Sequence, residues 1–94
     1  MKNLRKIVEE EKAAGRPKNP ALRRALRAAI LSAGAWSENF HSDTLVTIFP
    51  PYVPAGITAL TRAGRRDLIP ALRRRVASGR YDVSCLRDAK EIVA

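Results

Sequence analysis

A chain of 94 residues, 46% of them apolar, has the length of one domain and the material for one modest core. Its single cysteine, Cys85, excludes an internal disulfide, and one histidine, His41, leaves too few ligands for a zinc site of Cys and His. The net charge of +9 favours polyanionic partners, although dispersed surface charges also simply keep a protein in solution.

The apolar runs are too short for a membrane span. The longest, from Leu45 to Val53, is interrupted by Thr47 and two prolines, so we expect no membrane partner. A lone cysteine is typical of a reducing compartment, and we therefore expect a cytoplasmic protein. Only 5% of the residues are aromatic, so Leu, Ile, Val and Ala must build the core.

Residues 1–15 are predicted to form a basic N-terminal helix or arm. Leu4, Ile7 and Val8 recur at the spacing of one helical face, and Gly15 ends the pattern. A linker with one Gly and one Pro follows, which is typical of a break between elements. Its apolar stripe is short, so the segment could be a frayed arm until it docks, and the sequence does not determine whether it is ordered when free. Residues 1–94 are expected to form a single domain.

Residues 19–34 are predicted to form an amphipathic helix. Asn19 is a preferred N-cap, and Pro20 suits the first helical position. Gly34 stands where a left-handed C-cap is expected. One face of this helix is apolar and comprises Leu22, Ala25, Leu26, Ala29, Ile30 and Ala33.

Residues 35–54 are predicted to be the least regular part and hold four of the five aromatic residues. The β-branched residues 44–49 suit either a short strand or a short helix capped by Ser42 or Asp43. A lone strand has no obvious partner, which favours a helical turn or an extended segment. The choice between strand and helix stays open at this point.

Residues 55–94 are predicted to be helical again. One helix is closed by Gly64, and a second is capped by Asp67, carries Pro70 in its first turn and ends at Gly79. Ser84 is expected to cap a last helix. The fold predicted from these patterns is all-α, a small single domain of four to five short helices with an irregular aromatic-containing segment in the middle.

Residues suited to catalysis are few. Cys85 at a helix start could have an activated thiol, but a small buried residue explains it as well. His41 has no partner suggested by spacing, and three consecutive glutamates, 9–11, diverge around a helix and cannot converge on a metal. We therefore expect no enzyme, no cofactor and no metal.

Arginines and lysines cluster on the predicted helices, and the planar arginine fork is well suited to phosphates. A helix-turn-helix could be centred on Gly64, but Pro70 falls in the first turn of its second helix and argues against it. The residues predicted to contact phosphates or an acidic surface are Arg16, Lys18, Arg23, Arg24, Arg27, Arg73, Arg74 and Arg75.

The last third of the chain, about residues 68–94, resembles the C-terminal end of the FlgM family of anti-sigma factors. The family shows a helix with a Leu-x-x-x-Ile/Val-x-x-Gly pattern, then an aromatic, an aliphatic and a capping residue, and a final helix with an Ala and an aliphatic pair. Here this pattern falls on Leu72, Val76, Gly79, Tyr81, Val83, Ser84, Ala89, Ile92 and Val93. Asp88 replaces the family's aliphatic residue, and the N-terminal half does not match.

The resemblance implies a regulator that docks on a sigma factor or RNA polymerase, as a phage-type inhibitor of the transcription machinery also would. The contacts that it implies are Leu68, Leu72, Val76, Tyr81, Val83, Leu86, Ala89 and Val93. Packing of these residues in the domain's own core is an equal alternative. Binding of DNA or RNA through arginine-rich faces is the second functional hypothesis, and a structural subunit of a larger assembly is the third. The sequence leaves the oligomeric state undetermined.

Overall fold

Every regular element in the described part of the chain is a helix, which confirms the all-α prediction. The computed structural model describes residues 3–32, 36, 41–86 and 89–94. Its α-helices are α1 (Leu4–Ala14), α2 (Pro20–Leu31), α3 (His41–Ile48), α4 (Val53–Arg62), α5 (Ile69–Ser78) and α6 (Ala89–Val93). Single turns of 3-10 helix, η2 (Pro50–Tyr52), η3 (Arg66–Leu68) and η4 (Val83–Cys85), join them.

The first two helices start and stop largely where the sequence predicts. The Asn3 side chain caps α1 by accepting the Lys6 N–H at 2.8 Å, and Gly15 ends the helix with a left-handed φ of 80°. Asn19 caps α2, and Pro20 is its first residue. The helix ends at Leu31 with Ser32 as its C-cap, before the expected Gly34, which lies outside the described residues.

The middle of the chain is more regular than expected, because residues 41–48 form the eight-residue helix α3. All side chains from Asp43 to Phe49 are buried, so this segment is the central helix of the core. Surrounding helices explain why β-branched residues, which on their own favour a strand, are helical here. Ser42 and Asp43 lie inside the first turn and are not the cap.

Close packing brings α3 and α4 together around Trp36, which is 2% exposed. The indole N–H donates to the carbonyl of Ala29 at 2.8 Å and so satisfies one of the free carbonyls in the last turn of α2. A Cβ on Gly56 would lie 3.0 Å from Trp36 Cη2 and 3.3 Å from Val46 Cγ1. The absence of a side chain at Gly56 therefore permits this contact.

The C-terminal segment crosses from α5 to the far end of the molecule. Gly79 ends α5 with a φ of 68°, as predicted. The prediction for Ser84 is wrong: Asp82 caps the single turn η4 by accepting the Ser84 N–H at 2.9 Å, and α6 begins only at Ala89. Leu86 follows η4 and is buried in the core.

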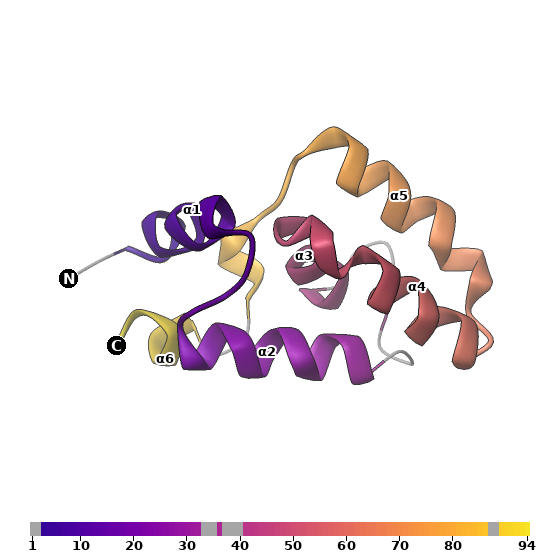
Figure 1. Cartoon of the computed structure of the whole chain (residues 1–94), viewed down its shortest axis with the longest axis horizontal. Coiled ribbons are helices and arrows are strands. Elements are labelled where there is room, and N and C mark those ends of the chain that lie inside the picture. The colour runs from indigo at the N-terminus through magenta and orange to yellow at the C-terminus, as the bar shows by residue number, and fades with distance from the viewer. Residues whose placement is uncertain (1–2, 33–35, 37–40, 87–88) are drawn as a thin grey trace.

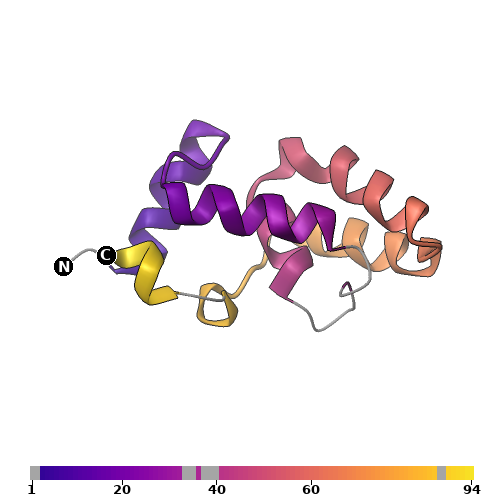
Figure 2. The same ribbon diagram turned by 90° about the horizontal axis from the view of Figure 1, so that it is seen from below.

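The helices are arranged around α3, which lies between α2 and α5 (Figure 1). The molecule measures 41 × 22 × 20 Å. At one end, α1 and α6 pack together beside the start of α2; at the other end, α4, η3 and α5 fold back on one another (Figures 1 and 2). The core runs between these ends, and its most deeply buried side chains are those of Val8, Leu22, Trp36, Val46, Ile48, Phe49, Leu60, Leu72 and Ile92.

Candidate nucleic-acid interface

Positive charge is concentrated in two segments of the chain. Residues 15–32 contain five Lys and Arg and no acidic residue. Residues 53–80 contain seven arginines and one acidic residue, Asp67, a net charge of +6. The rest of the chain has six basic and eight acidic residues, so these two segments carry the whole positive excess.

The first concentration is the α2 face, defined as Arg16, Lys18, Arg23, Arg24 and Arg27. The amphipathic pattern of α2 sets it, because Leu22 and Leu26 turn inward and the arginines are left on the exposed side. The Arg23 guanidinium donates to the carbonyl of Lys18 at 3.1 Å, which holds two cations together. Arg24 forms an ion pair with Glu91 of α6 and is the most neutralised member.

The second concentration is the arm, defined as residues 53–80 and formed by α4, η3 and α5. Burial of Leu72 and Ala71 orients α5 so that Arg73 and Arg74 are exposed. Arg62 and Arg66 are exposed at and just after the end of α4. The arm therefore presents four exposed arginines on the helices and on the turn that joins them.

Asp67 is bound within the arm and does not cap α5. Its carboxylate accepts hydrogen bonds from Arg65 Nε at 3.2 Å and from Arg65 Nη2 at 3.3 Å. This hydrogen bond holds the pKa of Asp67 below its ordinary value and raises the pKa of Arg65. The single negative charge of the arm is thereby paired with one of its seven arginines.

Arg75 was predicted to contact phosphates or an acidic surface, but its side chain pairs with a buried residue of the domain itself. Its guanidinium lies 2.7 Å from the carboxylate of Asp43, which is 3% exposed. Burial raises the pKa of Asp43 to about 6, although the charge of Arg75 and the backbone N–H of Thr44 act to lower it. The sequence indicates only a capping role for Asp43. The signal for its pair with Arg75 is that Asp43 is a lone acid among residues that form a buried helix.

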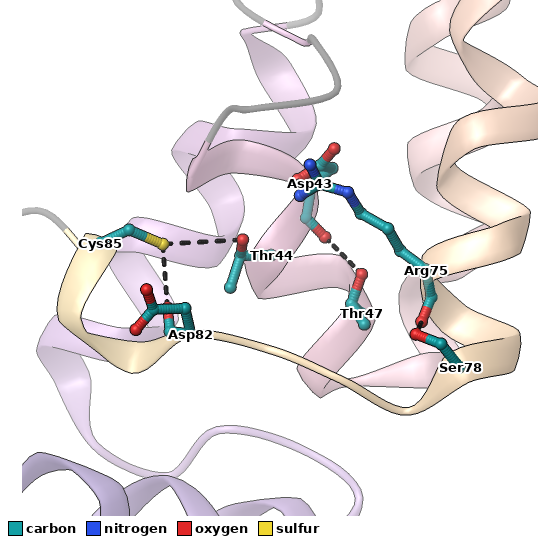
Figure 3. A network of polar contacts seen from close by, with 7 residues as sticks. All are labelled: Asp43, Thr44, Thr47, Arg75, Ser78, Asp82 and Cys85. Atoms are coloured by element: carbon teal, nitrogen blue, oxygen red, sulfur yellow. Dashed lines mark hydrogen bonds and ion pairs between the residues drawn. The ribbon is translucent and has the colours of Figure 1, made fainter.

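A polar cleft of about 440 Å³ lies beside this ion pair, between α3, α5 and η4 (Figure 3). Thr44 and Thr47 of α3 line one wall, and the thiol of Cys85 lies 3.7 Å from Thr44 Oγ1 and 2.9 Å from the carbonyl of Asp82. The Thr47 hydroxyl donates to the carbonyl of Asp43 at 2.8 Å. The contact between Cys85 and Thr44 joins the C-terminal segment to α3, and Cys85 therefore has a structural role. The side chain of His41 lies outside the described part of the structure.

The predicted protein-contact residues pack mainly against the domain itself. Leu72, Val83 and Leu86 are buried in the core, and Leu68, Val76, Tyr81 and Val93 pack against it half-buried. Ala89, at the start of α6, is half-buried. These residues therefore pack within the domain, completely for Leu72, Val83 and Leu86 and in part for the others. Among the described large apolar residues, only Leu31 is well exposed, at 73%.

Tyr81 joins this C-terminal segment to α1. The side-chain amine of Lys12 lies 4.8 Å from the centre of the Tyr81 ring, and the guanidinium of Arg5 lies 5.6 Å from it. Cations at this distance from a ring face are attracted to its π electrons. The Tyr81 hydroxyl oxygen is buried and has no hydrogen-bond partner within the described residues.

Within the described residues, no group of three or more His, Cys, Asp or Glu side chains is placed to hold a metal ion. In the same part of the chain, no helix has the length and apolar character needed to cross a membrane. Comparisons of the chain with protein-family models, curated proteins and solved structures found no match.

Proposed function

We propose that this domain binds double-stranded DNA without catalysing a reaction, through arginine contacts to phosphates. The observation that carries the proposal is the segregation of charge, with seven arginines and one paired aspartate in the arm. Exposed Arg62, Arg66, Arg73 and Arg74 are the proposed phosphate ligands, because each guanidinium can donate two parallel hydrogen bonds to one phosphate group.

The proposal is for phosphate binding and not for reading of base sequence. A recognition helix reads base edges with polar side chains near its N-terminus. The corresponding positions of α5 are Ile69 and the exposed Pro70, which offer no side-chain donor or acceptor. The arginines of the arm begin a turn later and suit the backbone of a duplex.

A duplex is the favoured form of nucleic acid. Single strands are usually held by aromatic side chains on which bases stack, and Trp36 and Phe49 are buried in the core instead. B-form DNA has a major groove wide enough for a helix to lie in it and reach phosphates on both sides, whereas that of A-form RNA is too narrow and deep. This access of a helix to phosphates supports DNA over double-stranded RNA as the partner.

Docking on a sigma factor or polymerase through the C-terminal apolar residues has less support in the folded domain. The residues that it requires are engaged in the core, so a partner would have to displace the segment from Tyr81 to Val93. Interfaces gain most of their energy from apolar anchors that are exposed before binding. The exposed arginine surfaces impose no such cost on DNA binding.

The test is fluorescence anisotropy of a labelled 20-base-pair duplex titrated with the whole chain at a series of salt concentrations. Four phosphate contacts predict that affinity falls about 150-fold between 50 and 200 mM salt, since each contact contributes about 0.9 to the slope of log K against log salt. Arg73→Gln with Arg74→Gln should weaken binding at least tenfold and lower that slope by about 2.

The matched control is Lys6→Gln with Lys90→Gln, which removes two exposed charges outside the arm and the α2 face. It should change affinity by less than threefold. Binding with no salt dependence would contradict the proposal, as would equal losses from both double variants. Tighter binding of a double-stranded RNA or a single strand of the same sequence would contradict the choice of DNA.

A further inference from the structure

The α2 face and the α5 part of the arm lie on opposite sides of α3, whereas α4 of the arm packs against α2. Both α2 and α5 pack against α3, which separates them (Figures 1 and 2). Leu22 and Leu26 turn one side of α2 toward the interior, and Leu72 does the same for α5. The exposed arginines Arg23 and Arg27 of α2 and Arg73 and Arg74 of α5 therefore lie outside the buried faces with which these helices pack against the core.

The two surfaces are far enough apart to act independently. Packed helices are about 8–10 Å apart between axes, which allows α2 and α5 to lie up to roughly 16–20 Å from each other across α3. The screening length of salt water is about 8 Å at physiological ionic strength. A phosphate backbone on one surface therefore leaves the positive potential of the other largely intact.

The α2 face is also suited to phosphates in its own right. Arg27 follows Arg23 by one turn, so the two share a side of the helix, and Lys18 is held beside Arg23 by the 3.1 Å hydrogen bond. Arg16 precedes them in the exposed linker. Residues 15–32 contain five cations and no acidic residue. Acidic side chains from other segments reach this face at two points: Glu91 pairs with Arg24, and the carboxylate of Glu11 accepts the backbone N–H of Lys18 at 2.6 Å.

We propose that the domain bridges two DNA duplexes, holding one on the arm and a second on the α2 face. This inference rests on the proposed function and extends it from binding to bringing duplexes together. One molecule suffices, because both surfaces belong to the same chain. The arm is the stronger site, since its net charge of +6 exceeds the +5 of residues 15–32.

The experiment mixes two 20-base-pair duplexes, one carrying a fluorescence donor and the other an acceptor, with the whole chain. The wild type should give energy transfer that is maximal near one protein for two duplexes and disappears when excess protein covers each duplex separately. Arg23→Gln with Arg27→Gln removes charge from the α2 face, and Arg73→Gln with Arg74→Gln from the arm. Each double variant should lose at least fivefold in energy transfer. In the anisotropy assay, Arg23→Gln with Arg27→Gln should still bind a duplex through the arm, whereas Arg73→Gln with Arg74→Gln should bind a duplex at least tenfold more weakly than the wild type.

The control Lys6→Gln with Lys90→Gln should retain the wild-type transfer signal. Full energy transfer from either single-face variant would overturn the inference, because bridging would then come from self-association through one remaining surface. Wild-type binding without energy transfer would also overturn it and would leave the proposed function standing. If the wild type does not bind a duplex in the anisotropy assay, the proposed function itself is refuted.

Discussion

Gly56 shows how a single position controls the closest helix contact of the core. Its missing side chain leaves room for Trp36 Cη2, 3.0 Å from where a Cβ would stand, and for Val46 Cγ1 at 3.3 Å. Both neighbours are buried and held by their own packing, so neither can retreat easily. Glycine at this position therefore lowers the helix propensity of α4 but allows close packing against α3 and Trp36.

Gly56→Ala is expected to destabilise the fold by about 1 kcal/mol. Alanine favours a helix over glycine by about 1 kcal/mol, but overpacking of a tight core costs about 1–3 kcal/mol and more than cancels this gain here. Urea unfolding measures the change. Thr58→Ala on the exposed side of the same helix is the control and should lie within about 0.5 kcal/mol of the wild type. A Gly56→Ala variant as stable as the wild type would show that the contact is loose.

Asp43 makes the stability of the domain depend on pH in an unusual direction. Its pKa is about 6 in the folded chain and 3.8 ordinarily, so between these values the folded state binds the proton more tightly than the unfolded state. The resulting contribution to stability is fully present below about pH 3.8 and is lost as the pH rises through 6.

Against an Asp43→Asn variant, the wild type should therefore lose relative stability from pH 4 to pH 7. A shift of about two pKa units corresponds to at most about 3 kcal/mol. The measurement is the free energy of unfolding of both proteins in urea across this pH range. Since every other titrating group is shared, a difference between the two proteins that stays constant or grows in favour of the wild type would contradict the raised pKa.

At the scale of elements, Asn19 joins three segments through one side chain and one backbone group. Its Oδ1 accepts the N–H of Ala21 at 2.8 Å and caps α2, while its Nδ2 donates to the carbonyl of Ile92 at 2.9 Å. Its own N–H donates to the carboxylate of Glu11 at 2.7 Å. The ends of α1, α2 and α6 are thus fixed to one another at a single residue.

Asn19→Asp separates these roles, because it keeps an acceptor for the cap and removes the donor to Ile92. We expect faster amide hydrogen exchange in α6 with little change in α2. Asn19→Ala removes both functions, should accelerate exchange in the first turn of α2 as well, and should cost about 1 kcal/mol more in stability. Equal exchange rates of α6 in Asn19→Asp and the wild type would show that the bond to Ile92 does not hold this helix.

The helices were predictable wherever a local signal ends them. Asn19 with Pro20, Gly15 and Gly79 mark their boundaries through capping and left-handed geometry, which depend on neighbouring residues only. The helix α3 was not predictable with certainty, because its β-branched residues favour a strand locally and only the surrounding helices reverse this. The prediction that Ser84 caps the last helix was also wrong. Asp82 accepts the backbone N–H of Ser84, so Ser84 lies inside the short helix η4 and does not start α6.

The candidate site was predictable as charge but not as geometry. Clusters of arginine are visible in the sequence, whereas the partners of Arg24 and Arg75 are 67 and 32 residues away and only the fold brings them together. The same long-range packing hides the apolar residues of the C-terminal third. Which arginines stay available for a ligand therefore depends on tertiary structure.

For the whole molecule, the charge of +9 on a body of 41 × 22 × 20 Å implies repulsion among the arginines. Added salt screens this repulsion, so the melting temperature should rise by a few degrees between 20 and 300 mM sodium chloride. Calorimetry or circular dichroism measures the rise, and Arg66→Gln with Arg73→Gln should reduce it. DNA affinity changes in the opposite direction over the same range, so a melting temperature that falls with salt would contradict this account of the surface charge.

The contact between Asn19 and Ile92 also governs when the protein can fold during its synthesis. Chains leave the ribosome from the N-terminus, so α2 emerges long before the residue that closes the core over its first turn. Until Ile92 has left the ribosome, the arginine-rich helix α2 of the nascent chain lacks this apolar side chain as a packing partner. The packing of α6 against the start of α2 can therefore form only after residue 92 has left the ribosome.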